Sequence, residues 1–180
     1  MNPNDPKTEL DRLLEATRDS SRPEAVSSRH AKGYRTAREN LDDLCDPGSF
    51  VEFGQLAVAA QRQRRSEEEL RRQTPADGVI TGLATINAEQ FGPAASEVAV
   101  IVYDYTVLAG TQGYFHHRKI DRILAVAEDR RLPVVIFTEG GGGRPGDTDV
   151  TTQVAGLDLP TFARFAGLAG KVPRIAAKTG

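Results

Sequence analysis

The chain has 180 residues, of which 39% are hydrophobic and 27% charged, and its formal net charge at pH 7 is −2. This length and balance predict one soluble, globular domain with a substantial core. The lack of a basic excess, together with only 6% aromatic residues, argues against a nucleic-acid-binding protein. The single cysteine, Cys45, excludes an internal disulfide and disfavours a thiolate metal site.

The N-terminal part of the chain predicts helices that need a partner surface. The N-terminal residues include neither a basic start nor an apolar run, so the sequence does not predict a signal peptide. No apolar stretch reaches the roughly 18 residues of a membrane span, so we expect a cytoplasmic protein that does not bind membranes. Leucines at helical spacing predict a helix over about residues 7–18, and a second helix is predicted over residues 23–44, before a turn at 46–49.

Beyond these helices the chain alternates between apolar strands and amphipathic helices. The predicted elements are strands at 50–53, 79–86 and 97–108, a helix at 116–131, a strand at 134–137, a helix at 159–170 and a strand at 173–177. The inward face of the first of these helices holds Ile120, Ile123, Leu124 and Ala127. This order is typical of right-handed β-α-β units, and the long apolar run at 97–108 predicts a strand buried on both faces.

Several polar clusters have both a functional and a structural interpretation. The arginines between residues 61 and 73 could grip a ligand phosphate, but glutamates nearly balance them, which favours a solvated segment of mixed charge. His116 and His117 point about 100° apart on a helix, so they cannot chelate one metal from a single face and are interpreted as polar residues at a helix start. Asp147 and Asp149 could form a metal pair, yet such residues are more often turn formers.

Two glycine-containing loops follow buried strands and are the best candidates for a site. They span residues 109–113 (Ala-Gly-Thr-Gln-Gly) and 139–146 (Glu-Gly-Gly-Gly-Gly-Arg-Pro-Gly). In α/β sheets, ligands bind beyond the carboxyl ends of the strands, where both loops are expected. The four glycines at 140–143 have no Cβ atoms, so their N–H groups could form an oxyanion hole, with a helix N-terminus adding positive charge. The alternative is a flexible surface loop.

Other familiar sites do not occur in the sequence. There is no G-x-x-x-x-G-K-[ST] phosphate loop and no G-x-G-x-x-G between a strand and a helix, which disfavours nucleotide hydrolysis. There is also no G-x-S-x-G nucleophile elbow, and no spacing supports a Ser-His-Asp triad. We predict no metal site in this chain.

Five sequence blocks carry a resemblance to a known family. In order they are AKGYRTARE (31–39), DPGSFVE (46–52), TPADGVITG (74–82), DYTV with AGTQG and KI (104–107, 109–113 and 119–120), and EGGGGR (139–144). Together these blocks resemble the carboxyltransferase subunits of biotin-dependent acetyl- and propionyl-CoA carboxylases. Glu139-Gly140 stands where the family carries Asp-Ser, and Gly143 where it carries Ala, which indicates a divergent branch.

The resemblance implies an α/β fold of the crotonase/ClpP-like kind, a ββα superhelix preceded by N-terminal helices. We therefore expect an N-terminal helical extension at residues 1–48 and a partial carboxyltransferase domain at 49–180. The family's domain continues past the last block, so we expect the superhelix to be incomplete. A second carboxyltransferase domain would complete the reaction site, and this chain alone would be inactive.

The resemblance also implies a reaction, namely carboxyl transfer from carboxybiotin to the α-carbon of an acyl-CoA. Negative charge develops on the thioester oxygen, and the family pattern assigns the N–H groups of Gly141 and Gly142 as its catalytic donors. The other residues expected on the acyl-CoA side are Gly110, Thr111, Gln112, Gly113, Lys119, Gly140, Gly143 and Arg144. The two basic residues either fix loops or meet CoA phosphates.

The implied partners are acyl-CoA, biotin carboxylase, the biotin carboxyl carrier protein that holds the biotin, and further copies of the chain in an oligomer. Two other functions stay open. A single-domain crotonase relative acting as a hydratase, isomerase or thioesterase would need a carboxylate near the oxyanion hole, and only Glu139 is close in sequence. The chain could instead be a truncated, non-catalytic module for CoA binding or assembly.

Overall fold

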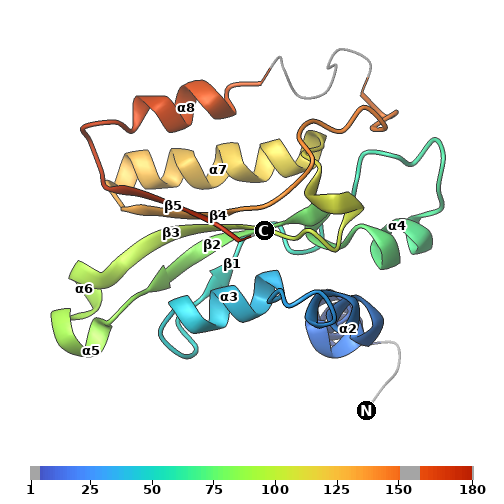
Figure 1. The fold of residues 1–180 in the computed structure, drawn as a ribbon, viewed down its shortest axis with the longest axis horizontal. Coiled ribbons are helices and arrows are strands. Elements are labelled where there is room, and N and C mark those ends of the chain that lie inside the picture. The colour runs from blue at the N-terminus through green and yellow to red at the C-terminus, as the bar shows by residue number, and fades with distance from the viewer. Residues whose placement is uncertain (1–4, 151–158, 180) are drawn as a thin grey trace.

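The computed structural model describes residues 5–150 and 159–179, which form one mixed sheet between two layers of helices (Figure 1). Residues 1–4, on which part of the expectation about a signal peptide rests, lie outside the described residues. The strand order follows the chain. The strands are β1 (Val51–Glu52), β2 (Val79–Thr85), β3 (Glu97–Tyr103), β4 (Val134–Thr138) and β5 (Arg174–Lys178).

The direction of the strands changes in the middle of the sheet. β1, β2 and β3 pair antiparallel, whereas β3, β4 and β5 pair parallel. Parallel neighbours need a crossover connection, and helices α7 (Tyr114–Arg130) and α8 (Thr161–Gly167) supply the two crossovers. The predicted succession of β-α-β units is therefore confirmed.

β3 is buried on both faces, as its apolar sequence predicts. Ala99 and Ile101 face the core beneath α7, while Val98, Val100 and Val102 face the opposite core. This alternation follows from the period of two along a strand. The residues of α7 that were predicted to point inward lie in the core between α7 and the sheet, with exposures of 2% or less. They are Ile120, Ile123, Leu124 and Ala127.

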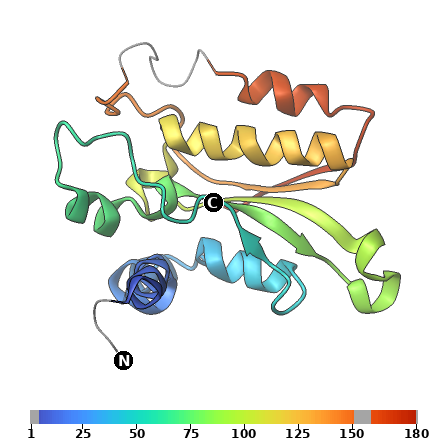
Figure 2. The same ribbon diagram turned by 180° about the vertical axis from the view of Figure 1, so that it is seen from behind.

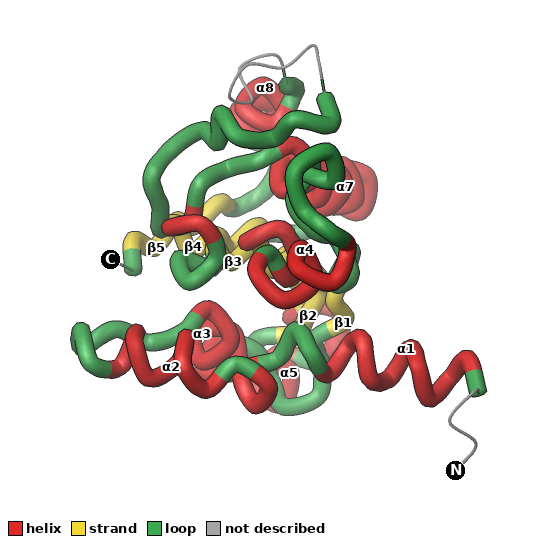
Figure 3. Tube along the Cα trace, turned by 90° about the vertical axis from the view of Figure 1, so that its right-hand side faces the viewer, coloured by secondary structure: helices red, strands yellow, loops and turns green. Residues whose placement is uncertain are grey.

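The opposite face of the sheet is covered by the N-terminal helices (Figures 2 and 3). They are α2 (Pro23–His30) and α3 (Ala37–Leu44), whereas α1 (Pro6–Glu15) extends past β1, beyond the edge of the sheet. α3 buries Ala37 and Leu41 in the core on this face of the sheet, next to Val98, Val100 and Val102, whereas α1 buries no side chain. The remaining short helices are η1 (Asp19–Ser21), α4 (Glu67–Gln73), η2 (Pro75–Gly78), α5 (Ala88–Phe91), α6 (Pro93–Ser96) and η3 (Leu108–Gly110).

The prediction of one continuous helix over residues 23–44 is wrong. Gly33 has a φ of +77°, which ends the helical path between α2 and α3. α3 then begins at a capping box: the Thr36 hydroxyl accepts from the Glu39 N–H at 3.1 Å, and the Glu39 carboxylate accepts from the Thr36 N–H at 2.8 Å. The Thr-x-x-Glu spacing is visible in the sequence and was the signal for this break.

Candidate functional site

The two glycine loops meet where β3 and β4 end, as their positions after parallel strands predict. The Gln112 N–H donates to the Gly142 carbonyl at 2.8 Å, and the Arg144 N–H donates to the Gln112 carbonyl at 2.8 Å. These two bonds form an isolated parallel bridge between Gln112 and Gly143. The loops are therefore joined to each other through their main chains.

Glycine is required where the loops cross. Gly110 has a φ of +66° and Gly140 a φ of +152°. A Cβ atom added to Gly110 would collide with the Glu139 carbonyl, and one added to Gly140 would collide with the Gly110 carbonyl. The backbones thus approach more closely than any side chain permits. Gly113 is similarly enclosed, because an added Cβ would meet the Arg144 guanidinium.

The amides of the four-glycine run differ in what they contact. The Gly141 N–H donates to the Ala109 carbonyl at 3.1 Å, so this predicted donor is already engaged. The N–H groups of Gly140, Gly142 and Gly143 make no hydrogen bond to the part of the chain that the structure describes. Gly142 has a φ of +82°, and a Cβ added there would meet no atom within 4 Å. Of the predicted catalytic pair, Gly142 is the one whose amide has no hydrogen-bond partner among the described residues.

A pocket of about 530 Å³ lies next to this crossing. Its wall combines both loops with the N-terminal helical layer and β5, and it contains two exposed lysines, Lys32 and Lys178. The lining residues are Arg29, Lys32, Tyr34, Tyr103, Tyr105, Gln112, Thr138, Glu139, Gly140 and Lys178. A larger cavity of about 1280 Å³ lies along α2, α3 and β1 and includes no residue of either loop.

The structure does not bring the two predicted basic contacts, Lys119 and Arg144, into this pocket. Arg144 is 6% exposed; it pairs with Asp77 and donates to the Thr111 carbonyl at 2.7 Å. Lys119 donates to the carbonyls of Ala76, at 2.9 Å, and Val79, and burial lowers its pKa to about 8. Their contacts fix loops within the protein, which was the structural interpretation of these side chains.

The N-terminus of α7, expected to add positive charge behind the first loop, is already capped. The Asp147 carboxylate accepts from the Tyr114 N–H at 2.7 Å, and the Asp77 carboxylate accepts from the His116 N–H at 2.7 Å. These carboxylates satisfy the N–H groups that would otherwise attract an anion. Asp149 similarly accepts from the backbone N–H groups of residues 62 and 63, so both Asp147 and Asp149 bind segments far away in the sequence instead of closing a local turn.

His116 and His117 lie in the first turn of α7, but both are buried, which the sequence did not indicate. The nearest polar partner of His116 Nδ1 is the Asp77 carbonyl at 3.2 Å, and that of His117 Nδ1 is the Thr161 hydroxyl at 3.1 Å. Burial lowers the pKa of both imidazoles. Among residues 5–150 and 159–179, no group of three or more His, Cys, Asp or Glu side chains is arranged to hold a metal ion.

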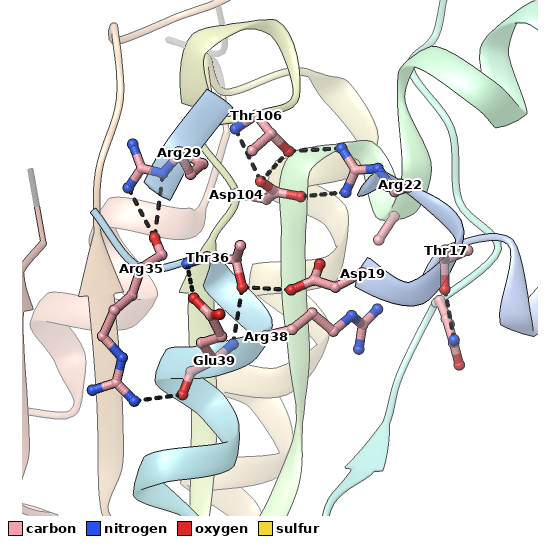
Figure 4. A network of polar contacts seen from close by, with 12 residues as sticks. Thr17, Asp19, Arg22, Arg29, Arg35, Thr36, Arg38, Glu39, Asp104 and Thr106 are labelled. Carbon is pink, nitrogen blue, oxygen red and sulfur yellow. Dashed lines mark hydrogen bonds and ion pairs between the residues drawn. The ribbon is translucent and has the colours of Figure 1, made fainter. Parts of the chain in front are cut away.

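One buried ion pair at the pocket was missed at the sequence level. The Arg29 guanidinium donates two hydrogen bonds of 2.7 Å to the Glu139 carboxylate. It also donates to the Arg35 carbonyl at 3.1 and 3.2 Å, a contact visible in Figure 4. The rings of Tyr34 and Tyr105 lie 4.9 and 5.3 Å from its central carbon. The two partners are 110 positions apart, so no local sequence signal indicates the pair.

A second arginine of the same helical layer holds the segment that follows β3. Arg22, at the start of α2, donates to Asp104 at 2.9 Å and to the Thr106 hydroxyl at 2.6 Å (Figure 4). Arg22 and Arg29 therefore stand at the two ends of α2 and bind different loops.

No helix in the described ranges is long and apolar enough to cross a bilayer.

Comparison with known sequences places these features in context. A sequence profile described as "Carboxyl transferase domain" matches residues 28–180. The chain is 34% identical over 154 residues to a propionyl-CoA carboxylase beta chain of Saccharopolyspora erythraea, covering 84% of this chain and 25% of that protein. It is 32% identical over 174 residues to a biotin-dependent long chain acyl-coenzyme A carboxylase beta4 subunit of Mycobacterium tuberculosis, covering 93% and 28%.

Solved structures give the same picture. The fold matches a single-chain, multi-domain long-chain acyl-CoA carboxylase with a TM-score of 0.89 and 58% identity, over 95% of this chain and 17% of that one. It also matches a transcarboxylase 12S structure with hydrolysed methylmalonyl-coenzyme A bound, with a TM-score of 0.68 and 27% identity, over 96% and 31%. The chain thus spans about a quarter of the length of the curated relatives it matches.

Proposed function

The chain belongs to the carboxyl transferase domain family, and on that premise we propose that it forms the acyl-CoA side of a biotin-dependent carboxyltransferase. Likeness to solved carboxyltransferases confirms the expected crotonase-like α/β fold. The observation that carries the proposal is the crossing of the two glycine loops. Among the described residues it leaves the amides of Gly140 and Gly142 without a hydrogen-bond partner, and Gly140 lines a pocket that also contains two lysines.

The chemistry requires donors for an oxygen that becomes negative when the acyl-CoA loses its α-proton. Preorganised main-chain N–H groups stabilise such an oxygen and need no reorganisation during reaction. We propose Gly142 as one donor. Gly141 can be the second only by exchanging its bond to the Ala109 carbonyl for one to the substrate. Gly140 lines the pocket, and its amide has no hydrogen-bond partner in the described part of the chain. Gln112, Thr111 and Gly143 would hold the opposing loop in place.

The exposed ammonium groups of Lys32 and Lys178 favour binding of an anionic ligand such as the phosphates of coenzyme A, because two positive charges in one pocket raise the local concentration of anions. These lysines, and not the buried Lys119 and Arg144, are available to it. The 58% identity to a long-chain acyl-CoA carboxylase makes a long acyl-CoA the first substrate to test.

The structure disfavours the hydratase, isomerase or thioesterase alternative. Glu139 is the carboxylate that such a reaction would use, yet both of its oxygens accept hydrogen bonds from Arg29. Before Glu139 could act as a base, its buried ion pair with Arg29 would have to break, and this costs free energy. A non-catalytic CoA-binding module would share the same pocket and is distinguished only by assay.

The proposal extends to the surroundings of the chain. Carboxybiotin would arrive on a biotin carboxyl carrier protein charged by a biotin carboxylase, and a second carboxyltransferase domain would supply the donors for biotin. The assembly would be an oligomer in the cytoplasm. Residues 1–48 would serve as a helical extension of the partial domain formed by residues 49–180.

Reconstitution tests the proposal. The chain is combined with the second carboxyltransferase domain, the carrier protein and the biotin carboxylase, and supplied with ATP, labelled bicarbonate and either palmitoyl-CoA or propionyl-CoA. Label should appear in the carboxylated acyl-CoA, and Gly142→Ala should lower kcat about tenfold or more by redirecting its amide. Label that reaches biotin but never an acyl-CoA overturns the proposal. The chain by itself should give no product.

A further inference from the structure

The four-glycine run needs external anchors if its amides are to hold one direction. Glycine loses more conformational freedom on ordering than any other residue, and a run of four has no side chain to pack. Its order must therefore come from its two ends, from the bridge to Gln112 and from the bond between the Gly141 N–H and the Ala109 carbonyl. At the C-terminal end, Arg144 binds Asp77 and Thr111.

At the N-terminal end the anchor is Arg29, which comes from the helical layer on the opposite side of the sheet. Its two equal bonds of 2.7 Å to Glu139 fix both the position and the plane of that carboxylate. Glu139 is the residue between β4 and the first glycine, and its own carbonyl packs against Gly110 at the crossing. Movement of Glu139 therefore moves the crossing.

Arg29 is itself held rigidly. Its side chain is 7% exposed, it donates to the Arg35 carbonyl, and it lies between the rings of Tyr34 and Tyr105. A guanidinium stacked on aromatic rings and hydrogen-bonded on several sides keeps one orientation, which an ammonium on a flexible stem does not. These contacts exceed what docking of α2 alone requires, because Arg22 already ties α2 to Asp104.

We propose that Arg29 is a positioning residue of this site: through its bidentate pair with Glu139 it sets the direction in which the glycine run leaves β4, and hence the direction of the Gly142 amide. The loop-ordering step stands independently of the reaction. Its consequence for turnover rests on the proposed carboxyltransferase function.

Amide hydrogen exchange tests the ordering step in the intact chain. The reporters are the three hydrogen-bonded amides of the crossing, Gln112, Gly141 and Arg144. Arg29→Gln should accelerate exchange at Gln112 and Gly141 about tenfold or more, since opening of the loop then needs no ion pair to break. Arg38→Gln is the matched control because Arg38, on α3 of the same helical layer, makes a comparable buried pair with Glu52 of β1 and binds neither glycine loop, and it should leave these amides unchanged.

Arg29→Gln leaves the Glu139 carboxylate unpaired, so the double variant Arg29→Gln with Glu139→Gln is measured beside it. The double variant carries no buried charge, yet it should still show faster exchange because the bidentate geometry is lost. Arg29→Lys, which keeps the charge but not the fork, should fall between the wild type and Arg29→Gln. Equal exchange at the crossing in the Arg29 variants and in the wild type overturns the inference.

In the reconstituted assembly, Arg29→Gln should lower kcat about tenfold to hundredfold while the KM for palmitoyl-CoA changes less than about threefold, because a misdirected donor weakens transition-state binding most. Arg38→Gln should alter neither constant. A parallel loss of kcat in both variants assigns Arg29 to helix docking alone and overturns the inference. If the wild type transfers no label to any acyl-CoA, the proposed function fails, and the exchange comparison still decides the role of Arg29.

Discussion

Both ends of the glycine run are held by a buried ion pair, but the two ion pairs lie in different surroundings. Each end carries a buried ion pair to a residue far away in the sequence: Glu139 to Arg29, and Arg144 to Asp77. At the C-terminal end the paired side chains are 4% and 0% exposed, and Asp77 also caps α7. At the N-terminal end they are 7% and 8% exposed and line the pocket.

This difference separates stability from function. The Arg144–Asp77 pair joins the loop to a helix N-terminus and to the η2 turn, so its loss affects the packed domain. The Arg29–Glu139 pair joins the loop to a helical layer across the sheet (Figure 1), so its loss first affects the loop beside the pocket. We therefore expect the Arg144–Asp77 pair to contribute mainly to stability, and the Arg29–Glu139 pair to contribute mainly to the geometry of the site.

The largest effect is expected at the C-terminal anchor. Arg144→Ala leaves the Asp77 carboxylate buried without its cation, which should lower the free energy of unfolding by about 3–5 kcal/mol. Urea denaturation followed by circular dichroism measures this change. Arg144→Ala with Asp77→Asn is the control, because it removes the orphaned charge and should recover part of the loss. A loss under about 1 kcal/mol in the single variant would contradict the role given to this anchor.

The crossing itself comes next. Gly110→Ala places a Cβ atom against the Glu139 carbonyl at a positive φ, and overpacking together with a left-handed backbone should cost about 2–4 kcal/mol. Gly33→Ala is the matched control, since its φ is also positive but its added Cβ meets nothing within 4 Å. It should cost only about 1 kcal/mol. Equal losses in the two variants would show that the loops do not cross this closely in solution.

How far the sequence predicts the molecule depends on the range of the interactions. The strands from β2 onward and the helices α7 and α8 follow from local periodicity, although β3 ends at Tyr103 and not at residue 108, and the meeting of the two loops follows from parallel strands. The short helices α5, α6 and η3 were not predicted. The break in the N-terminal helical layer is also indicated locally, by Gly33 and by the Thr-x-x-Glu spacing at Thr36, although the predicted helix over residues 23–44 runs through both. The engagement of Gly141 by Ala109 and the burial of Arg29 depend on segments that meet only after folding.

Acid should destabilise the fold through the two buried histidines at the N-terminus of α7. Burial lowers the pKa of His116 and His117, so between these lowered values and the unfolded pKa of about 6.5 the unfolded chain binds more protons than the folded one. Stability should therefore fall as the pH drops below about 6.5, by up to about 1.4 kcal/mol per pH unit for each histidine. The imidazole Nδ1 of His116 lies 3.2 Å from the main-chain carbonyl of Asp77, so protonation of His116 acts beside the partner of Arg144. Denaturation midpoints between pH 5 and 7 that do not shift would contradict this.

The smallest effect is expected from an ion pair without burial. Arg71 pairs with Glu67 one helical turn away on α4, with side-chain exposures of 38% and 61%. Solvent screens such a pair, so Arg71→Ala should change the free energy of unfolding by about 0.3–0.5 kcal/mol. Measured in the same urea series, it gives the baseline for the two buried anchors, because all three contain an arginine and a carboxylate. If the loss matched that of Arg144→Ala, then ion pairing alone, and not its burial at the ends of the glycine run, would account for both anchors.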